Sequence, residues 1–287
     1  MLSHPMALKP HRAALAAGLA WLMALPALPA HAMLGDRDVA RLVSFGGSCG
    51  KCELSGRKLS GARFIGASFV GASLVGSDLQ DSRFLGADFS NADLSHADLS
   101  DAEMIGANFT GAKLAAAQLK GLDAKGVTFA GADLSRADLR DVEALGANFF
   151  KARLTGAKLT SASLTGANFG HVEARGADFR DATMHGANLA GGMFDKASFR
   201  DADLVASVLA GGSFAGADFR DANLGHTVLV GADLSRAKGL RQDQLAQACG
   251  DAATRLPRGL TLKPCSRAAW ARAPGPTVEV RIVSTGN

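Results

Sequence analysis

The amino-acid sequence predicts an all-β solenoid built from short stacked strands. From Leu54 to Leu234, every fifth residue is Leu, Phe, Met or Ala, over 37 consecutive positions without an insertion. A period of five fits neither an α-helix, which repeats every 3.6 residues, nor a continuous strand, which repeats every two. A fixed period is typical of a solenoid, in which each repeat buries its apolar side chains only against neighbouring repeats.

Each five-residue unit combines a three-residue strand with a two-residue turn. In Ala87-Asp88-Phe89, two apolar residues flank a polar one, which is the alternation of a strand with one face buried. The next two residues are often polar or glycine, as in Thr110-Gly111, and glycine permits the backbone to turn. Each unit therefore predicts one short, straight side of a coil.

The spacing of phenylalanine predicts four units in each coil. Sets of Phe recur every twenty residues: Phe69, Phe89, Phe109, Phe129, Phe149 and Phe169; Phe179, Phe199 and Phe219; Phe64 and Phe84; Phe194 and Phe214. With four sides to a coil, each set becomes a stacked ladder of rings. The two longer sets differ by ten residues, which places them on opposite sides of a square.

Three irregular units support the inward assignment of two positions per unit. Where the central residue shrinks to Ala, the residue two positions earlier is larger than the usual Ala: Leu122 with Ala124, Val142 with Ala144, and Val172 with Ala174. Packed interiors resist voids, so volume lost at one inward position is expected to be refilled beside it.

Units such as GADFS and TGANF resemble those of the pentapeptide-repeat proteins over about residues 52–239. This resemblance implies a right-handed quadrilateral β-helix with four pentapeptides per coil. The 37 units then make about nine coils.

Residues 1–32 have the pattern of a secretory signal peptide. A basic front with Lys9 and Arg12 precedes an apolar run over 13–28, and Ala30-His31-Ala32 is an A-x-A cleavage site. The alternative, a membrane anchor, is disfavoured because the apolar run is short for a membrane span. We expect cleavage after Ala32, no further span, and a periplasmic or secreted protein with a lead-in over 33–51.

The cysteines suggest two bridges. Cys49 and Cys52 form a C-x-x-C pair at the start of the repeats, for which a local disulfide, a redox or metal role and free thiols are the alternatives.

Residues 240–265 are expected to cap the coil, with a short helix from Leu240 to Ala248. The segment 244–265 resembles the terminal segment of exported pentapeptide-repeat proteins, and we expect a Cys249–Cys265 disulfide there. Residues 266–287 are predicted to be a loose tail, in which 278–283 could add an edge strand.

Two outward rows follow the same twenty-residue step. One is apolar and interrupted by Lys125, with members Ile65, Leu85, Ile105 and Leu145. It suggests a weak partner surface, with scattered surface aliphatics as the alternative. The other row is basic: Lys120, Arg140, Arg180, Arg200 and Arg220. Asp141, Asp181, Asp201 and Asp221 directly follow its four arginines, so we expect a solvated face whose charges pair with one another.

The sequence contains no evident catalytic, cofactor-binding or metal-binding constellation. The histidines after residue 32 are far apart: His96, His171, His185 and His226. The net charge is +4, and two of the basic residues, Lys9 and Arg12, lie in the leader, so nothing favours a nucleic-acid partner. The sequence favours an exported, non-enzymatic scaffold that binds an unknown protein or has a structural role in the cell envelope. It does not indicate an oligomeric state. The alternative is a redox or metal role for residues 49–52. Some members of the resembled family mimic DNA and bind DNA gyrase, but that role calls for an acidic, cytoplasmic rod.

Overall fold

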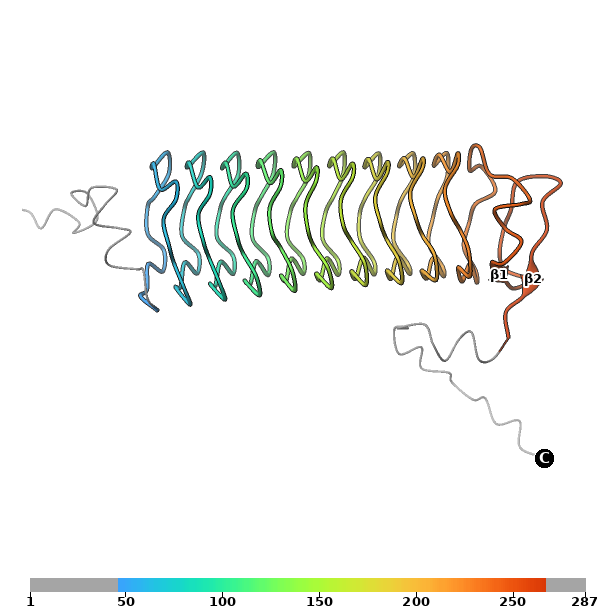
Figure 1. Cartoon of the computed structure of the whole chain (residues 1–287), viewed down its shortest axis with the longest axis horizontal. Coiled ribbons are helices and arrows are strands. Elements are labelled where there is room, and N and C mark those ends of the chain that lie inside the picture. Colours follow the sequence, from blue (N-terminus) through green and yellow to red (C-terminus); the bar gives the residue numbers. More distant parts are fainter. Residues whose placement is uncertain (1–45, 267–287) are drawn as a thin grey trace, which may run out of the picture. The chain divides into compact units, whose positions relative to one another are not determined.

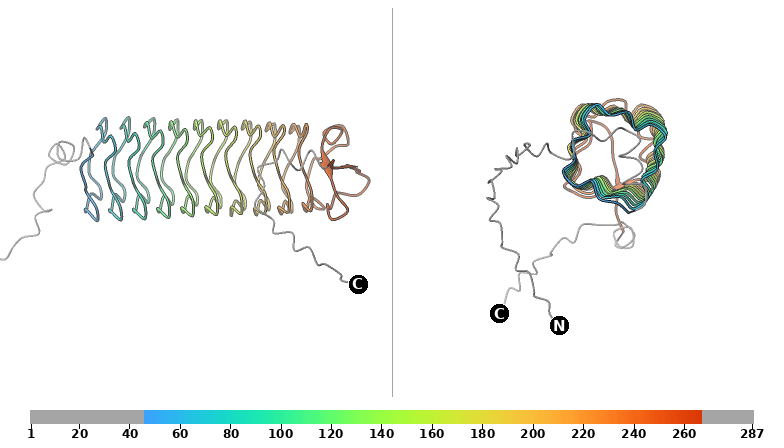
Figure 2. Two further views of the ribbon diagram at one scale, coloured as in Figure 1. Left: turned by 90° about the horizontal axis from the view of Figure 1, so that it is seen from below. Right: turned by 90° about the vertical axis from the view of Figure 1, so that its left-hand side faces the viewer.

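A computed structural model describes residues 46–266, all within one compact unit, Leu34–Asn287. In this part of the chain, parallel bridges join each outward strand residue to the residue twenty positions later, from Ser48↔Ser68 to Asp218↔Lys238. Figure 1 shows the resulting stack of coils, and in Figure 2 the coils superimpose end-on as a four-sided outline. The uniform step confirms four pentapeptides in each coil.

Each side of a coil bonds to the coils on both of its flanks. The N–H of Asp88 donates to the carbonyl oxygen of Ala67 at 2.9 Å, and the N–H of Phe89 donates to that of Asn108 at 2.7 Å. A turn follows, in which the N–H of Ala72 donates back to the carbonyl oxygen of Phe69 at 3.0 Å. The third residue of that turn, Gly71, has a φ of 64°, which L-residues adopt reluctantly. This requirement explains why glycine recurs in the units.

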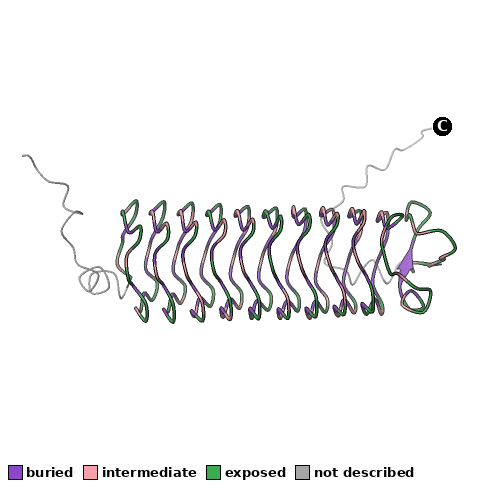
Figure 3. Cartoon of the chain, turned by 90° about the horizontal axis from the view of Figure 1, so that it is seen from above, coloured by how far each residue is buried: buried purple, intermediate pink, exposed green. Residues whose placement is uncertain are grey.

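The interior is filled by the phenylalanine ladders that the sequence predicts. The rings of Phe89 and Phe109 stack with centroids 4.8 Å apart, and those of Phe179 and Phe199 stack at 5.1 Å. Where the long ladder ends, Phe169 meets Phe179 edge-on at 5.9 Å, so opposite sides touch across a narrow core. Figure 3 colours the chain by burial, with buried residues in every coil and exposed residues at the turns.

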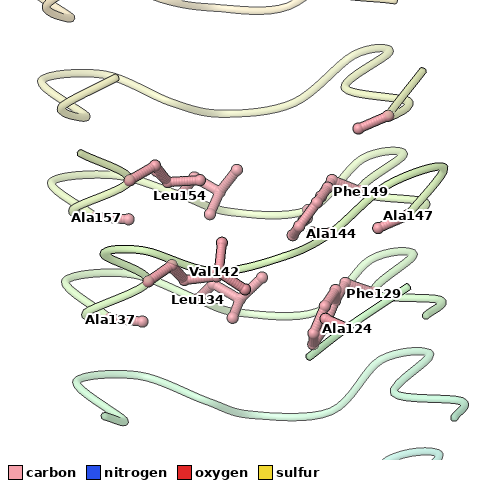
Figure 4. Packing of buried hydrophobic residues seen from close by; sticks show 14 of the residues in the cluster. Ala124, Phe129, Leu134, Ala137, Val142, Ala144, Ala147, Phe149, Leu154 and Ala157 are labelled. Atoms are coloured by element: carbon pink, nitrogen blue, oxygen red, sulfur yellow. The ribbon is translucent and has the colours of Figure 1, made fainter. Parts of the chain in front are cut away.

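Volume compensation is also confirmed. Ala124 and Ala144 are buried next to the equally buried Leu122 and Val142, and Figure 4 shows Val142 beside Leu134 in the core. The reverse adjustment occurs at Gly192, where an added Cβ would lie 2.5 Å from the Phe194 ring. Small and large inward residues are therefore matched within each side.

The first coil begins earlier than expected. The bridge from Ser48 to Ser68 and the buried position of Cys49 place residues 48–51 in the coil, although the sequence assigned them to the lead-in. The expected signal peptide over 1–32 and the edge strand over 278–283 lie outside the described residues. Within residues 46–266, the structure has no helix of the length and apolarity needed to cross a membrane.

The expected helix from Leu240 to Ala248 is wrong. This segment forms successive turns, with hydrogen bonds between residues three apart, such as that from the N–H of Leu245 to the carbonyl oxygen of Gln242 at 3.2 Å. It follows Gly239, whose φ is +69°, and it lies across the last regular coil. There the side-chain amide of Gln244 donates to the carbonyl oxygens of Phe219 and Ala222, at 2.8 and 2.7 Å. The segment therefore supplies hydrogen-bond donors to carbonyl groups at the end of the coil, instead of forming the backbone hydrogen bonds of a helix.

The cap then continues the coil with extra residues. Strand β1 (Cys249–Gly250) pairs in parallel with β2 (Lys263–Pro264), and Cys249 also bridges Val228, one residue beyond the regular step. Arg255 bridges Asp233, two residues beyond it. Four apolar residues of the cap pack against the end of the core: Leu240, Leu256, Leu260 and Leu262. The cap therefore covers the strand groups and side chains that an open coil would expose.

Candidate functional site

The four sides of the coil share one backbone geometry but differ in their outward residues. We call one side the uncharged face, because a single outward strand residue, Asp88, is charged among those of the described regular coils: Ser48, Ser68, Asp88, Asn108, Thr128, Asn148, Asn168, Asn188, Val208 and Val228. The side ten residues away is the charged face: Lys58, Asp78, Asp98, Gln118, Asp138, Lys158, Asp178, Ser198, Asp218 and Lys238. In a coil of twenty residues, these two sides are opposite.

The predicted apolar row lies on one corner of the uncharged face. Ile65 is 41%, Ile105 36% and Leu145 43% exposed, while Leu85 is half-buried. The coils bring these residues into a column, as the hydrogen bonds from the N–H of Gly66 to the carbonyl of Leu85, and from Gly86 to Ile105, indicate. The residues therefore stand in one column, which we call the stripe and in which Lys125 separates Ile105 from Leu145.

The structure adds a second apolar corner that sequence analysis missed. Val70 is 37% exposed, and Phe150 is half-buried in the same column on the other edge of the uncharged face. Sequence analysis missed this corner because the two residues do not form a periodic apolar row: Ser90 and Thr110 stand between them at the twenty-residue step. Among the described residues, all of the large exposed hydrophobic side chains thus border this one face.

Lys125 interrupts the stripe without leaving its charge unpaired. Its Nζ atom lies 2.6 Å from Glu143 and 2.9 Å from Asp123, which occupy outward strand positions of the adjacent side. Hydrogen bonds to Glu143, and then to Asp123, raise the pKa of the lysine above its ordinary value. The ammonium group is therefore neutralised by carboxylates that lie beside the uncharged face.

The polar groups of the uncharged face are bonded to one another. The side-chain amide of Asn168 donates to the Oδ1 atom of Asn148 at 3.2 Å, and that of Asn188 donates to Asn168 at 3.1 Å. The Oδ1 atom of Asn168 also accepts the backbone N–H of Gly170 at 3.0 Å. Because these groups have partners within the protein, covering them removes few unpaired polar groups from water.

The basic row pairs with aspartates, but not with the ones the sequence suggested. Arg140 contacts Asp138 at 2.6 Å and Arg180 contacts Asp178 at 2.7 Å; Arg220 pairs in the same way with Asp218. Each partner precedes its arginine by two residues, on the charged face. Asp141, which directly follows Arg140, occupies the turn position with a φ of 59°. The strand carboxylate is the one that also accepts the backbone N–H of its arginine, as Asp138 does for Arg140.

These pairs lower the pKa values of aspartates on the charged face. Hydrogen bonds from the Arg140 and Arg220 guanidinium groups are the main cause that holds the pKa values of Asp138 and Asp218 below the ordinary range. Arg200 differs, because Ser198 stands where the other arginines have an aspartate. The Nε atom of Arg200 is buried without a hydrogen-bond partner among the described residues. The three arginines at 140, 180 and 220 are therefore neutralised by strand aspartates, whereas Arg200 and Lys120 have Ser198 and Gln118 at the equivalent position.

His171 and His185 do not share one site. His185 lies 2.5 Å from Asp203, and His171 packs edge-on against the Phe150 ring at 5.7 Å, so these two histidines lie in separate environments. Within residues 46–266, no group of three or more His, Cys, Asp or Glu side chains is placed to hold a metal ion. Two depressions of about 300 and 350 Å³ lie on the cap, next to Cys265 and Gln244.

The four cysteines form two disulfides. Cys49 is joined to Cys52 with Cα atoms 5.3 Å apart, and Cys249 to Cys265 with Cα atoms 4.8 Å apart. Cys49 occupies an inward position and is buried. The first bridge thus closes a corner of the first described coil, and the second fastens the end of the cap to the C-terminal end of the uncharged face.

The family model for pentapeptide repeats matches the chain in eight copies between residues 48 and 236. The chain belongs to the pentapeptide-repeat family. Among solved structures it is similar to HetL, a pentapeptide-repeat protein involved in heterocyst differentiation regulation from the cyanobacterium Nostoc sp. strain PCC 7120. The two share 28% identity over 75% of this chain and 85% of HetL, with a TM-score of 0.57.

A second similar structure is QnrB1, a plasmid-mediated fluoroquinolone resistance protein. It is 24% identical over 78% of this chain and 96% of QnrB1, with a TM-score of 0.42. No curated protein matches the chain. The family-model match and the likeness to HetL agree with the predicted family and with a pentapeptide-repeat β-helix.

Proposed function

We propose that this protein is an exported, non-enzymatic scaffold that binds a protein partner through its uncharged face. The observation that carries the proposal is the placement of Ile65, Val70, Ile105 and Leu145 on the two corners that border this face. The cores of protein interfaces are depleted of charged residues, and an exposed apolar patch favours a partner. Ile65 and Leu145 are four coils apart, or roughly 19 Å at the usual strand spacing.

The export part of the proposal rests on the leader pattern over 1–32 and on the cysteines. Disulfides form and persist in oxidising compartments, and all four cysteines are bridged. A periplasmic or secreted location fits both features. Cell fractionation and N-terminal sequencing test this part: we expect a mature chain that starts at Met33, and an intact cytoplasmic chain would contradict it.

The binding part is tested with Leu85→Asp combined with Ile105→Asp. Both residues point outward, so we expect a folded protein that no longer captures the partners crosslinked to the wild type in envelope extracts. The control is Val75→Asp with Ala115→Asp, which places two carboxylates on the diagonally opposite corner, two coils apart. Circular dichroism checks folding. Equal capture by the double variant and the control would contradict the assignment of this face.

The same extracts test the redox alternative for Cys49 and Cys52. A scaffold with structural bridges should react with a thiol reagent only after reduction and unfolding. A pair that reacts in the native exported protein would favour thiol–disulfide exchange, because that chemistry needs an accessible thiolate.

A further inference from the structure

The corner that carries the stripe has no side chains at its turn position. The residues that directly follow the stripe column are glycine in seven successive coils: Gly66, Gly86, Gly106, Gly126, Gly146, Gly166 and Gly186. A Cβ atom added to any of them would meet no atom beyond its chain neighbours within 4 Å, so the space outside this strip is open. The positive φ alone does not require glycine, because Asp101, Ala116 and Lys196 adopt a φ of 57°, 55° and 59° at other corners. Another protein can therefore approach the coil backbone closely along this corner.

The side next to the stripe carries a row of charges that changes sign along the coil. Its outward strand residues, each two positions before a stripe position, are Arg63, Arg83, Glu103, Asp123 and Glu143, which we call the bordering row. Arg83 pairs with Glu103 at 3.1 Å, and Lys125 pairs with both carboxylates beyond it. Arg63 is exposed and forms no ion pair within residues 46–266. The N-terminal end of the row therefore has an excess positive charge, and the other end has one lysine for two carboxylates.

We propose that the stripe binds a second copy of this chain, with the two coils antiparallel about a two-fold axis at Ile105. A two-fold axis that lies in the interface and crosses both coils reverses their direction, and it keeps the bordering row of one copy beside that of the other. Such an interface is isologous, so each contact away from the axis occurs twice. The proposal rests on the function proposed above, because it keeps that binding surface and names its occupant.

The apolar residues of the stripe fit this register. Ile105 meets its own copy at the axis. Ile65 and Leu145 lie two coils to either side, or about 10 Å away, so Ile65 of one copy faces Leu145 of the other. A shift of one coil would instead set Ile65 opposite Lys125 or Thr165, and the apolar side chains would no longer face one another.

The lysine within the stripe is compatible with the same interface. Leu85 of one copy faces Lys125 of the other. The Nζ atom of this lysine is held 2.6 Å from Glu143 and 2.9 Å from Asp123, so its charge lies toward the bordering row and its alkyl stem can cover the leucine. Contact at this position therefore does not bury an unpaired charge.

The charges select the same register independently. Arg63 of one copy faces Glu143 of the other, and Arg83 faces Asp123, so the positive end of each bordering row meets the negative end of its copy. The two Glu103 side chains meet at the axis, where each is already paired with its own Arg83. Parallel coils would set the bordering row against the uncharged face instead. Complementary charges fix orientation and register at an interface, and here they agree with the apolar contacts.

Cysteine crosslinking tests the axis. The native cysteines are all bridged, so an introduced cysteine supplies a free thiol. Ile105→Cys should form a covalent dimer with a short bis-maleimide, because the two copies of this residue meet. Ile65→Cys and Leu145→Cys should each give little dimer, since each lies about 19 Å from its own copy, whereas the variant with both should crosslink efficiently. Thr155→Cys is the matched control, exposed on the diagonally opposite corner, and should stay monomeric.

Charge exchange tests the orientation. Arg63→Glu and Glu143→Arg should each weaken dimerisation several-fold, measured by analytical ultracentrifugation of the purified protein from low to high micromolar concentration. Mixing the two variants should restore the dimer, because each copy then supplies the charges that face those of the other. A misfolded variant could not be rescued in this way.

Several results would overturn the inference. The wild type could remain monomeric across that range, Ile105→Cys could crosslink no better than Thr155→Cys, or the mixed charge variants could fail to associate. A dimer that survives Leu85→Asp with Ile105→Asp would form through another surface.

The proposed function is judged separately, by capture from envelope extracts. If the wild type is monomeric and Leu85→Asp with Ile105→Asp still abolishes capture, the binding surface stands and only the second copy is rejected as its occupant. Equal capture by that variant and its control would reject the surface itself.

Discussion

The uncharged and charged faces are built from the same backbone and the same interior. Phe109 stacks behind the first and Phe199 behind the second, with centroids 4.8 and 5.1 Å from a neighbouring ring. Their outward strand residues make the same bridges in steps of twenty. Outside, one face presents hydrogen-bonded asparagines and the other presents aspartates paired with arginines.

This difference shows that folding and surface chemistry are separable in this protein. The coil is specified by two inward residues per unit and by a turn that accepts a positive φ. The outward strand residue contributes its backbone to the ladder whatever its side chain. Its side chain is therefore available for binding, and the contrast between opposite faces is the feature that points to function.

The largest expected effect tests whether the two interiors are equivalent. Phe109→Ala and Phe199→Ala should each lower the free energy of unfolding by roughly 3–5 kcal/mol, because each leaves a cavity in a ring stack. Denaturant titration measures this. The outward controls Thr128→Ala and Ser198→Ala should stay within about 0.5 kcal/mol, as surface substitutions usually do. A large loss on only one of the two faces would mean that the ladders do not support the coil equally.

A smaller effect should appear in acid, to which the arginine-paired aspartates of the charged face contribute. Arginine hydrogen bonds lower the folded-state pKa values of Asp138 and Asp218. Below the ordinary aspartate pKa of about 3.9, the unfolded chain then binds more protons than the folded one. The stabilisation is complete above that pH and is lost as the pH falls through the lower folded-state values.

Denaturation midpoints measured from neutral pH down through this window test the assignment. Asp138→Asn with Asp218→Asn should flatten the decline, whereas Asn148→Ala with Asn168→Ala on the uncharged face should leave its slope unchanged. If the asparagine variants remove the acid dependence instead, the charge contrast between the faces does not control it.

The smallest expected effect concerns the gap in the arginine–aspartate pairs. Ser198→Asp would supply Arg200 with the partner that its neighbours have, and should stabilise the protein by up to about 1 kcal/mol, less in high salt. Thermal unfolding at low and high ionic strength measures it. Asn168→Asp on the uncharged face lacks a nearby arginine row and should give no stabilisation. A similar gain from both substitutions would argue for a general charge effect.

The sequence anticipated most of the interior and less of the surface. The five-residue period and the twenty-residue spacing of Phe69 through Phe169 follow directly from packing, so both could be recognised without coordinates. The pairing of Arg140 with Asp138 rather than Asp141 was not evident, because it depends on where each side chain leaves the coil. The helix assigned to 240–248 failed because its apolar spacing was outweighed by the need of the last coil for hydrogen-bond donors.

By itself, the sequence determined the coil, its four sides, its phenylalanine ladders and the apolar column from Ile65 to Leu145. These features repeat, and a repeated side chain in a close-packed stack can have only one neighbour at each step. Only the tertiary structure decided that Val70 and Phe150 border the same face as that column. It also decided that the Cys249–Cys265 disulfide lies beside Val228. Those relations join positions without a common period, and they exist only because the coil and its cap bring distant turns side by side.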